Sequence, residues 1–301
     1  MCGIAGFLSK RADGPVASTV LGSMLKGLRG RGPDSTGLGL YEPAANGSNI
    51  VRVWCGDDED AADRARERAE TAFGVEASDF AFGVLRFRVA ATTPVADVCA
   101  VVEESDDHVE VFSVGRSLQI YKHVTDGEEL ARHYGLHGSP GRHGVGHSRL
   151  ATESRVDVQH AHPFWARPFA DICVVHNGHI TNYHKLRRLY EMRGHRFFTG
   201  NDSELLALYL AQRLEGGESI RQAMEASIRD LDGSFSYLLA TADGIGLCRD
   251  RVGSMPGVIA ETDDWVAVAS EPVAIHQAFG EAAERASFRE LGVGRAEMWT
   301  L

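Results

Sequence analysis

The second residue of the chain is a cysteine, and the five residues after it are all glycine or apolar. Such a run predicts a buried β-strand, because its glycines let neighbouring backbones pack closely. Removal of Met1 would leave Cys2 with a thiol and a free α-amine on one residue. An α-amine has an ordinary pKa of about 7.7–8.0 and can take the thiol proton. The chain is therefore expected to begin inside the molecule, at a nucleophilic site.

Composition places the chain among ordinary globular proteins. It has 301 residues, 44% hydrophobic and 24% charged, enough for one large domain or two small ones. The net charge of −11 argues against nucleic acid and anionic membranes as partners. No apolar run reaches the roughly 18 residues of a membrane span, and no secretory signal opens the chain. The five cysteines are scattered, without metal-binding spacing, which predicts reduced thiols and a cytoplasmic location.

Periodicity divides the chain into three parts. The first part has a predicted helix over 15–28 and a strand over 37–41. In the middle part, about 43–142, predicted strands and helices alternate. It is interpreted as an inserted α/β segment without evident chemistry. Its predicted elements are a helix over 60–73 and strands over 50–54, 80–90, 109–114 and 118–123.

The last part alternates differently, with strands, then helices, then strands again. Helices are predicted over 182–193, 205–214, 219–231 and 272–279, and strands near 145–150, 172–176, 234–241, 244–249, 257–260, 265–270 and 294–301. This order predicts an α+β fold in which stacked sheets lie between helical layers.

Asn177 and Gly178 directly follow the predicted strand over 172–176. A side-chain amide next to a glycine N–H can form an oxyanion hole for acyl transfer, with the glycine allowing close approach of the backbone. The alternative is an Asn-Gly hairpin turn, which is a strong turn signal in its own right.

Two charged residues could hold a small substrate. Arg149 stands at a strand end, where it can bind a carboxylate through two parallel hydrogen bonds or form a surface ion pair. Asp202 precedes an apolar helix, where it can bind an ammonium group or cap the helix, a role open also to Ser203.

Metal and nucleotide sites are not favoured. His160, His162, His176 and His179 lack the partner segment of a zinc site, and the acidic run at 57–60 is typical of a solvated face. The sequence contains no Walker loop, no GxGxxG after a strand and no GxSxG elbow.

A thiol, an oxyanion hole, a carboxylate clamp and an ammonium clamp together describe attack on the side-chain amide of an amino acid. Glutamine fits this description. The thiol would form an acyl-enzyme thioester, ammonia would leave, and water would then release glutamate.

Four motifs in this order resemble the class II glutamine amidotransferases, which are N-terminal nucleophile hydrolases with a four-layer αββα sandwich. They are Cys2-Gly3-Ile4-Ala5-Gly6 with Arg31-Gly32-Pro33-Asp34, His147-Ser148-Arg149-Leu150-Ala151-Thr152, His176-Asn177-Gly178, and Asn201-Asp202-Ser203-Glu204. The resemblance implies such a sandwich over residues 1–301.

The resemblance also implies roles for single residues. Cys2 would be the nucleophile and, through its α-amine, the base, while Asn177 and Gly178 would stabilise the oxyanion. Glutamine would be held by Arg149, Thr152 and Asp202, under a lid that contains Arg31. Glu153 stands where some relatives have histidine, a departure at the outer edge of the glutamine site.

Further motifs stand at 114–116, 120–122, 146–154, 230–233 and 249–250. With them, the pattern is most similar to the stand-alone glutaminase-like subunit of glutamate-synthase-like complexes, such as N-methylglutamate synthase. This likeness implies a partner synthase subunit that accepts the ammonia. Flavin and iron–sulfur clusters would belong to that partner, since this chain has neither cluster spacing nor a flavin-binding barrel and is expected to carry no cofactor. Two alternatives stay open: a hydrolase of another amide, and a non-catalytic regulatory subunit that binds amino acids.

Overall fold

Two antiparallel sheets form the centre of the protein in a computed structural model that describes residues 2–44, 46–151 and 155–301. The seven-stranded sheet has the order β15 (Ser287–Glu290), β13 (Val258–Glu261), β14 (Trp265–Ala269), β1 (Gly3–Ser9), β8 (His143–Arg149), β2 (Ser35–Tyr41), β7 (Leu118–His123). The five-stranded sheet has the order β16 (Arg295–Thr300), β12 (Gly244–Arg249), β11 (Gly233–Thr241), β10 (Cys173–Ile180), β9 (Phe164–Trp165).

Alternation of side chains along the strands explains why the sheets stack. In β1, Ile4 and Leu8 belong to the core between the two sheets, whereas Ala5 and Phe7 belong to a second core under helices. Between Ile4 and Leu8 lies Gly6, where an added Cβ would lie 3.0 Å from Leu238 of the facing sheet. The glycine therefore lets the sheets approach closely.

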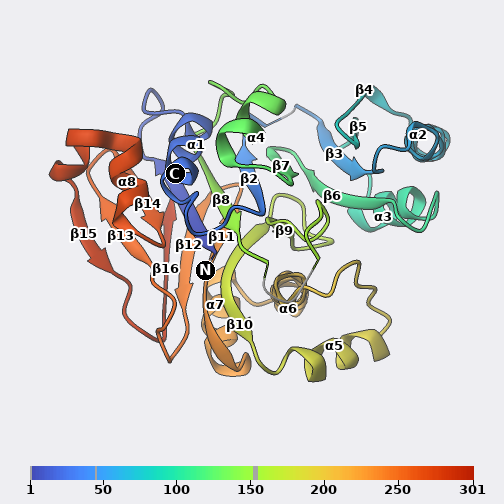
Figure 1. Cartoon of the computed structure of the whole chain (residues 1–301). Helices are drawn as coiled ribbons and strands as arrows, with labels where there is room; N and C mark the ends of the chain where they lie inside the picture. Colours follow the sequence, from blue (N-terminus) through green and yellow to red (C-terminus); the bar gives the residue numbers. More distant parts are fainter. Residues whose placement is uncertain (1, 45, 152–154) are drawn as a thin grey trace.

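Helices cover the outer faces of both sheets (Figure 1). The second core joins the seven-stranded sheet to α1 (Ala17–Gly27), α4 (Gly127–His133) and α8 (Pro272–Phe279). A third core joins the five-stranded sheet to α5 (Tyr183–Met192), α6 (Asp202–Glu215) and α7 (Ile220–Asp230). The result is the predicted α+β sandwich of four layers, αββα.

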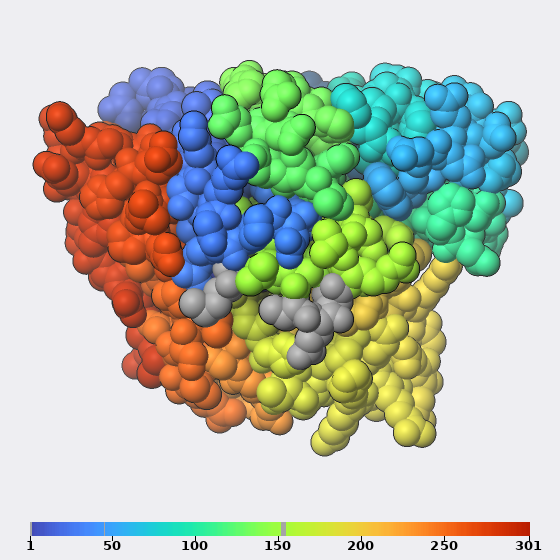
Figure 2. All heavy atoms as spheres, in the orientation of Figure 1, coloured from blue at the N-terminus to red at the C-terminus, as the bar shows by residue number. Residues whose placement is uncertain are grey.

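The insertion builds a sheet of its own, with the order β4 (Glu76–Ala81), β5 (Val84–Ala90), β3 (Ser48–Trp54), β6 (Glu110–Gly115). Helices α2 (Glu59–Phe73) and α3 (Val95–Glu103) pack on it. These residues form a lobe at one end of the molecule, opposite the C-terminal strands (Figure 2). The separate sheet covers less than the expected 43–142, because β7 pairs with β2 in the main sheet.

Several sequence-based predictions need correction. The single strand expected over 80–90 is a hairpin, because Phe82 and Gly83 both adopt positive φ and turn the chain. Helices α3 and α4 were not predicted. The Asp126 side chain, which caps α4 by accepting hydrogen bonds from the N–H groups of Glu128 and Glu129, was the local signal for that helix.

The described part of the chain contains no helix long and apolar enough to cross a membrane.

Gly6→Val tests the close contact between the sheets. The added side chain would enter the space of Leu238, and overpacking of this kind costs about 1–3 kcal/mol. The free energy of unfolding, measured by denaturant titration, should fall by that amount. Gly22→Ala in α1 is the control, since a Cβ there meets nothing within 4 Å and should stabilise the helix by about 0.5–1 kcal/mol. A Gly6→Val protein as stable as the parent would contradict the packing.

Candidate active site

Strand pairing fixes the position of the Cys2 thiol. Cys2 immediately precedes β1, which lies between β14 and β8 in the seven-stranded sheet. The thiol lies against the residue after β8: the N–H of Leu150 donates to Sγ at 3.3 Å, and Sγ lies 3.4 Å from the Leu150 carbonyl oxygen. Burial raises the pKa of the Cys2 thiol, while the Leu150 N–H and the charges of Arg149 and Arg31 act in the opposite direction.

Arg31 contacts the backbone of the nucleophile. Its Nε donates to the Cys2 carbonyl oxygen at 2.9 Å, and its guanidinium also pairs with Glu271. Arg31 is not among the described residues that line the adjacent cavity. Its contacts are therefore with Cys2 and Glu271, and not with the cavity in which glutamine was expected to bind.

A cavity of about 330 Å³ opens beside Cys2. Its walls come from the end of β8, from β10 and the residues after it, and from the start of α6. The described lining residues are Cys2, Arg149, Leu150, Ala151, His162, His176, Gly178, His179, Ile180, Thr181, Tyr183, His184, Gly200, Asn201, Asp202 and Ser203. The volume is in the range of small-molecule sites.

Asn177 and Gly178 lie inside β10, which continues to Ile180 and pairs with β11 throughout. The Asn-Gly turn is therefore wrong, because the ladder does not break there. Gly178 lines the cavity at φ 119°, where a Cβ would lie 2.1 Å from the Ser234 carbonyl oxygen. Asn177 is buried beside it, and its Nδ2 has no hydrogen-bond partner among the described residues. A buried amide N–H left without an acceptor is costly, but Asn177 is not among the described residues that line the cavity, whereas Gly178 is.

The cavity brings a cation and an anion together. Arg149 ends β8 and is 3% exposed, with its Nη1 donating to the Arg155 carbonyl oxygen at 3.0 Å. Asp202 is the first residue of α6, and its Oδ2 accepts from the Ile180 N–H at 2.9 Å. The cap of α6 is Asn201, whose side chain accepts from the Ser203 N–H, so neither Asp202 nor Ser203 is the N-cap.

A buried network that the sequence did not indicate lies against the cavity. The Ser203 hydroxyl bonds to His162 Nε2 at 2.7 Å and to His176 Nδ1 at 2.9 Å. Burial lowers the pKa of both imidazoles, which favours their neutral forms. His176 Nδ1 also lies 3.6 Å from Asp202 Oδ1. The network therefore orients the wall that carries Asp202.

Two further points concern Thr152 and metal binding. Thr152 lies outside the described residues. Within the described ranges, no group of three or more His, Cys, Asp or Glu side chains is placed to hold a metal ion.

Comparison with known proteins identifies the family. The chain is 35% identical over 286 residues to a Methanothermobacter thermautotrophicus protein named "Putative glutamine amidotransferase", covering 92% of this chain and 93% of that protein. It is 37% identical over 273 residues to the glutamine amidotransferase-like protein GlxB of Rhizobium meliloti, covering 90% and 89% of the two chains. The chain belongs to the class II glutamine amidotransferases.

The other comparisons agree with this family. Residues 147–277 match the family described as a glutamine amidotransferase domain. The fold matches the solved glutamine phosphoribosylpyrophosphate amidotransferase of B. subtilis with a TM-score of 0.65 at 18% identity, over 99% of this chain. The chain spans about half of that protein, 47% of its length. This amidotransferase thus has the fold of the N-terminal nucleophile hydrolases, and the family acts on the glutamine amide.

Arg149→Met tests the electrostatics of the nucleophile. The Arg149 charge lowers the pKa of the Cys2 thiol, so its removal should leave less thiolate, the form that reacts with electrophiles. Alkylation of Cys2 by iodoacetamide at pH 8 should slow by roughly three- to tenfold. The control is Arg155→Met, since that side chain is 86% exposed. Equal alkylation rates in the two variants would contradict the assignment.

Proposed function

We propose that this amidotransferase hydrolyses L-glutamine to glutamate and ammonia through a thioester on Cys2, and that the ammonia passes to a partner synthase subunit. One observation carries the proposal: a thiol, a glycine of an oxyanion segment, a guanidinium and a carboxylate line one cavity of about 330 Å³. No simpler ligand than an amino acid with a reactive side-chain carbonyl would use all four.

The first half of the reaction forms the thioester. The Cys2 α-amine, free after removal of Met1, accepts the thiol proton, and Sγ attacks the side-chain carbonyl carbon of glutamine. The developing oxyanion accepts hydrogen bonds from Asn177 Nδ2 and the Gly178 N–H. The C–N bond then breaks, the protonated α-amine returns its proton to the leaving nitrogen, and ammonia is released.

The second half restores the enzyme. The α-amine takes a proton from water, whose oxygen attacks the thioester carbonyl at the same oxyanion site. Collapse of the intermediate breaks the C–S bond, returns the proton to sulfur and releases glutamate. The neutral amine is the base in each half, which is why its exposure by removal of Met1 is part of the proposal.

Substrate orientation follows from charge. Arg149 would bind the α-carboxylate with a two-pronged hydrogen bond, and Asp202 would bind the α-ammonium group. Thr152 is proposed as a further contact, and Arg31 would orient Cys2 through its carbonyl oxygen. Recognition of both α-groups favours a free amino acid over a peptide or another amide.

We further propose that the ammonia acceptor is a cytoplasmic synthase of the glutamate-synthase or N-methylglutamate-synthase type, with its flavin and iron–sulfur clusters outside this chain. Two relatives matched over about nine-tenths of their length are named as amidotransferases or amidotransferase-like proteins only. Their names support an amidotransferase role for a chain of this length, and the type of acceptor is proposed from the sequence resemblance alone.

Cys2→Ala and Asn177→Ala test the mechanism in the complex that co-purifies with the chain. Cys2→Ala should abolish glutamate formation. Asn177→Ala should lower kcat by about 10²–10³ with little change in KM, because the amide acts on the oxyanion rather than on bound glutamine. Asn182→Ala is the matched control, since that side chain bonds outside the cavity to the Asp230 carbonyl oxygen.

Full glutaminase activity of Cys2→Ala would overturn the proposal in favour of another nucleophile. Glutamine binding without turnover in the parent complex would instead indicate a regulatory subunit.

A further inference from the structure

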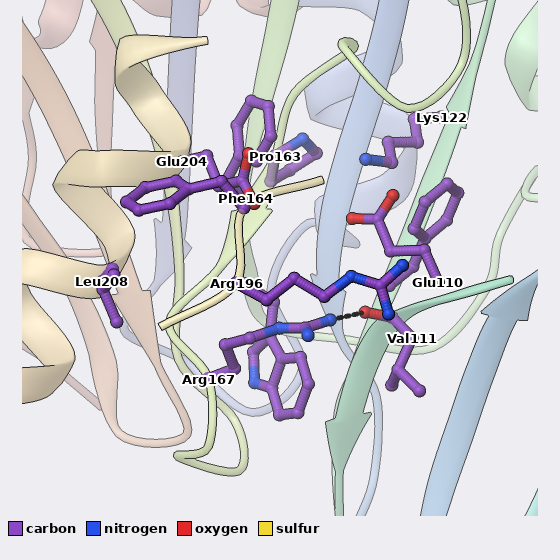
Figure 3. Close-up of a pocket in the computed structure, with 12 residues that line it drawn as sticks. Glu110, Val111, Lys122, Pro163, Phe164, Arg167, Arg196, Glu204 and Leu208 are labelled. Atoms are coloured by element: carbon purple, nitrogen blue, oxygen red, sulfur yellow. Dashed lines mark hydrogen bonds between the residues drawn. The ribbon is translucent and has the colours of Figure 1, made fainter. Parts of the chain in front are cut away.

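A small charged cavity lies where the insertion meets the glutaminase core (Figure 3). Its volume is about 30 Å³, room for one molecule the size of water and far too small for glutamine. The charged residues that line it are Glu110, Lys122, Arg167, Arg196 and Glu204. They come from β6, from β7, from the loops after β9 and before α6, and from α6 itself. The cavity is too small to be a second substrate site. We call the place where these elements meet around it the junction.

Glu110 and Lys122 occupy the centre of this junction, 6% and 3% exposed, and their side chains point toward one another (Figure 3). Burial raises the pKa of Glu110 and lowers that of Lys122. Two buried charges of this kind cost free energy unless polar partners compensate them. Both contact Gln159. The side-chain Nε2 of Gln159 donates to Glu110 Oε2 at 3.0 Å, and the backbone carbonyl oxygen of Gln159 accepts from Lys122 Nζ at 3.2 Å.

Gln159 belongs to a segment, residues 155–162, that contacts Arg149 and the residue before Asp202. At its start, the Arg155 carbonyl oxygen accepts from Arg149 Nη1 at 3.0 Å. Next to Gln159, the His160 carbonyl oxygen accepts from Asn201 Nδ2 at 3.3 Å. Asn201 in turn caps α6, whose first residue is Asp202.

We propose that Glu110 and Lys122 are positioning residues for glutamine binding: through Gln159 they hold the 155–162 segment, which sets the spacing between Arg149 and Asp202. The inference rests on the proposed function and assigns the insertion a role in it. Neither residue touches the substrate cavity, so both act through the segment.

The path is continuous and short. From Glu110 it runs through the Gln159 side chain, the His160 carbonyl oxygen and the Asn201 amide to the first turn of α6. The Glu110–Gln159 and His160–Asn201 steps are hydrogen bonds between partly buried or buried groups, where such bonds hold geometry well, and the step from Gln159 to His160 is the covalent chain. Displacement of β6 relative to β7 would therefore be transmitted to the first turn of α6, where Asp202 lies.

The test measures glutamine affinity in the Cys2→Ala protein, where binding is separated from turnover. Isothermal titration with L-glutamine should show a Kd raised about fivefold or more by Gln159→Ala and by Glu110→Ala. Glu110→Gln keeps an acceptor for Gln159 Nε2 and should restore most of the affinity. Glu110→Ala and Gln159→Ala break the same path. The double variant should therefore have a Kd for glutamine no higher than that of the weaker-binding single variant.

Glu103→Ala is the matched control. Glu103 makes a two-pronged ion pair with Arg167 at the same junction but has no bond to the 155–162 segment among the described residues. This variant should lose stability and keep its glutamine affinity. Gln159→Ala leaves all buried charges in place and covers the case in which Glu110→Ala fails to fold.

The outcomes separate the two proposals. If Cys2→Ala binds glutamine and Gln159→Ala binds it equally well, the positioning role is wrong and the proposed function stands. Additive losses in the double variant would likewise overturn the positioning role. If Cys2→Ala shows no affinity for glutamine, the proposed function fails, and the inference that rests on it fails too.

Discussion

The structure depends on where β1 lies. Because β1 pairs with β14 on one side and β8 on the other, the residue before it is delivered to the end of β8, against the Leu150 backbone. The facing sheet closes over β1 at Gly6, where a side chain larger than hydrogen would meet Leu238. Strand pairing and sheet stacking thus place the thiol, and the cavity forms where β8, β10 and α6 meet around it.

Much of this arrangement was predictable from short motifs. Cys2, Arg149, Gly178 and Asp202 were each singled out from local sequence, and all four line one cavity. What local sequence could not provide is the environment of these groups. The histidine–serine network of His162, His176 and Ser203 joins residues far apart in the chain, and no periodicity marks it. The Asn-Gly turn failed for a related reason, since pairing with β11 overrides the local preference.

The insertion shows the same limit. Its helices and strands were partly evident, yet the sequence showed no chemistry in it, and its acidic run at 57–60 was interpreted as a solvated face. The structure buries Glu110 and Lys122 and joins them to Gln159, a residue beside the substrate wall. Buried charges are expensive to keep, and a role in positioning the clamps gives a reason for them. The 155–162 segment is therefore one link between the insertion and the amidotransferase core, beside the Glu103–Arg167 ion pair.

The account depends on Cys2 being both the terminal residue and the reacting thiol. Intact mass of the purified complex, before and after treatment with diazo-oxo-norleucine, tests this directly because the reagent combines a glutamine-like body with an electrophile. The account predicts loss of the mass of Met1 and one adduct that peptide mapping places on Cys2. A retained Met1, or an adduct on another residue, would contradict it.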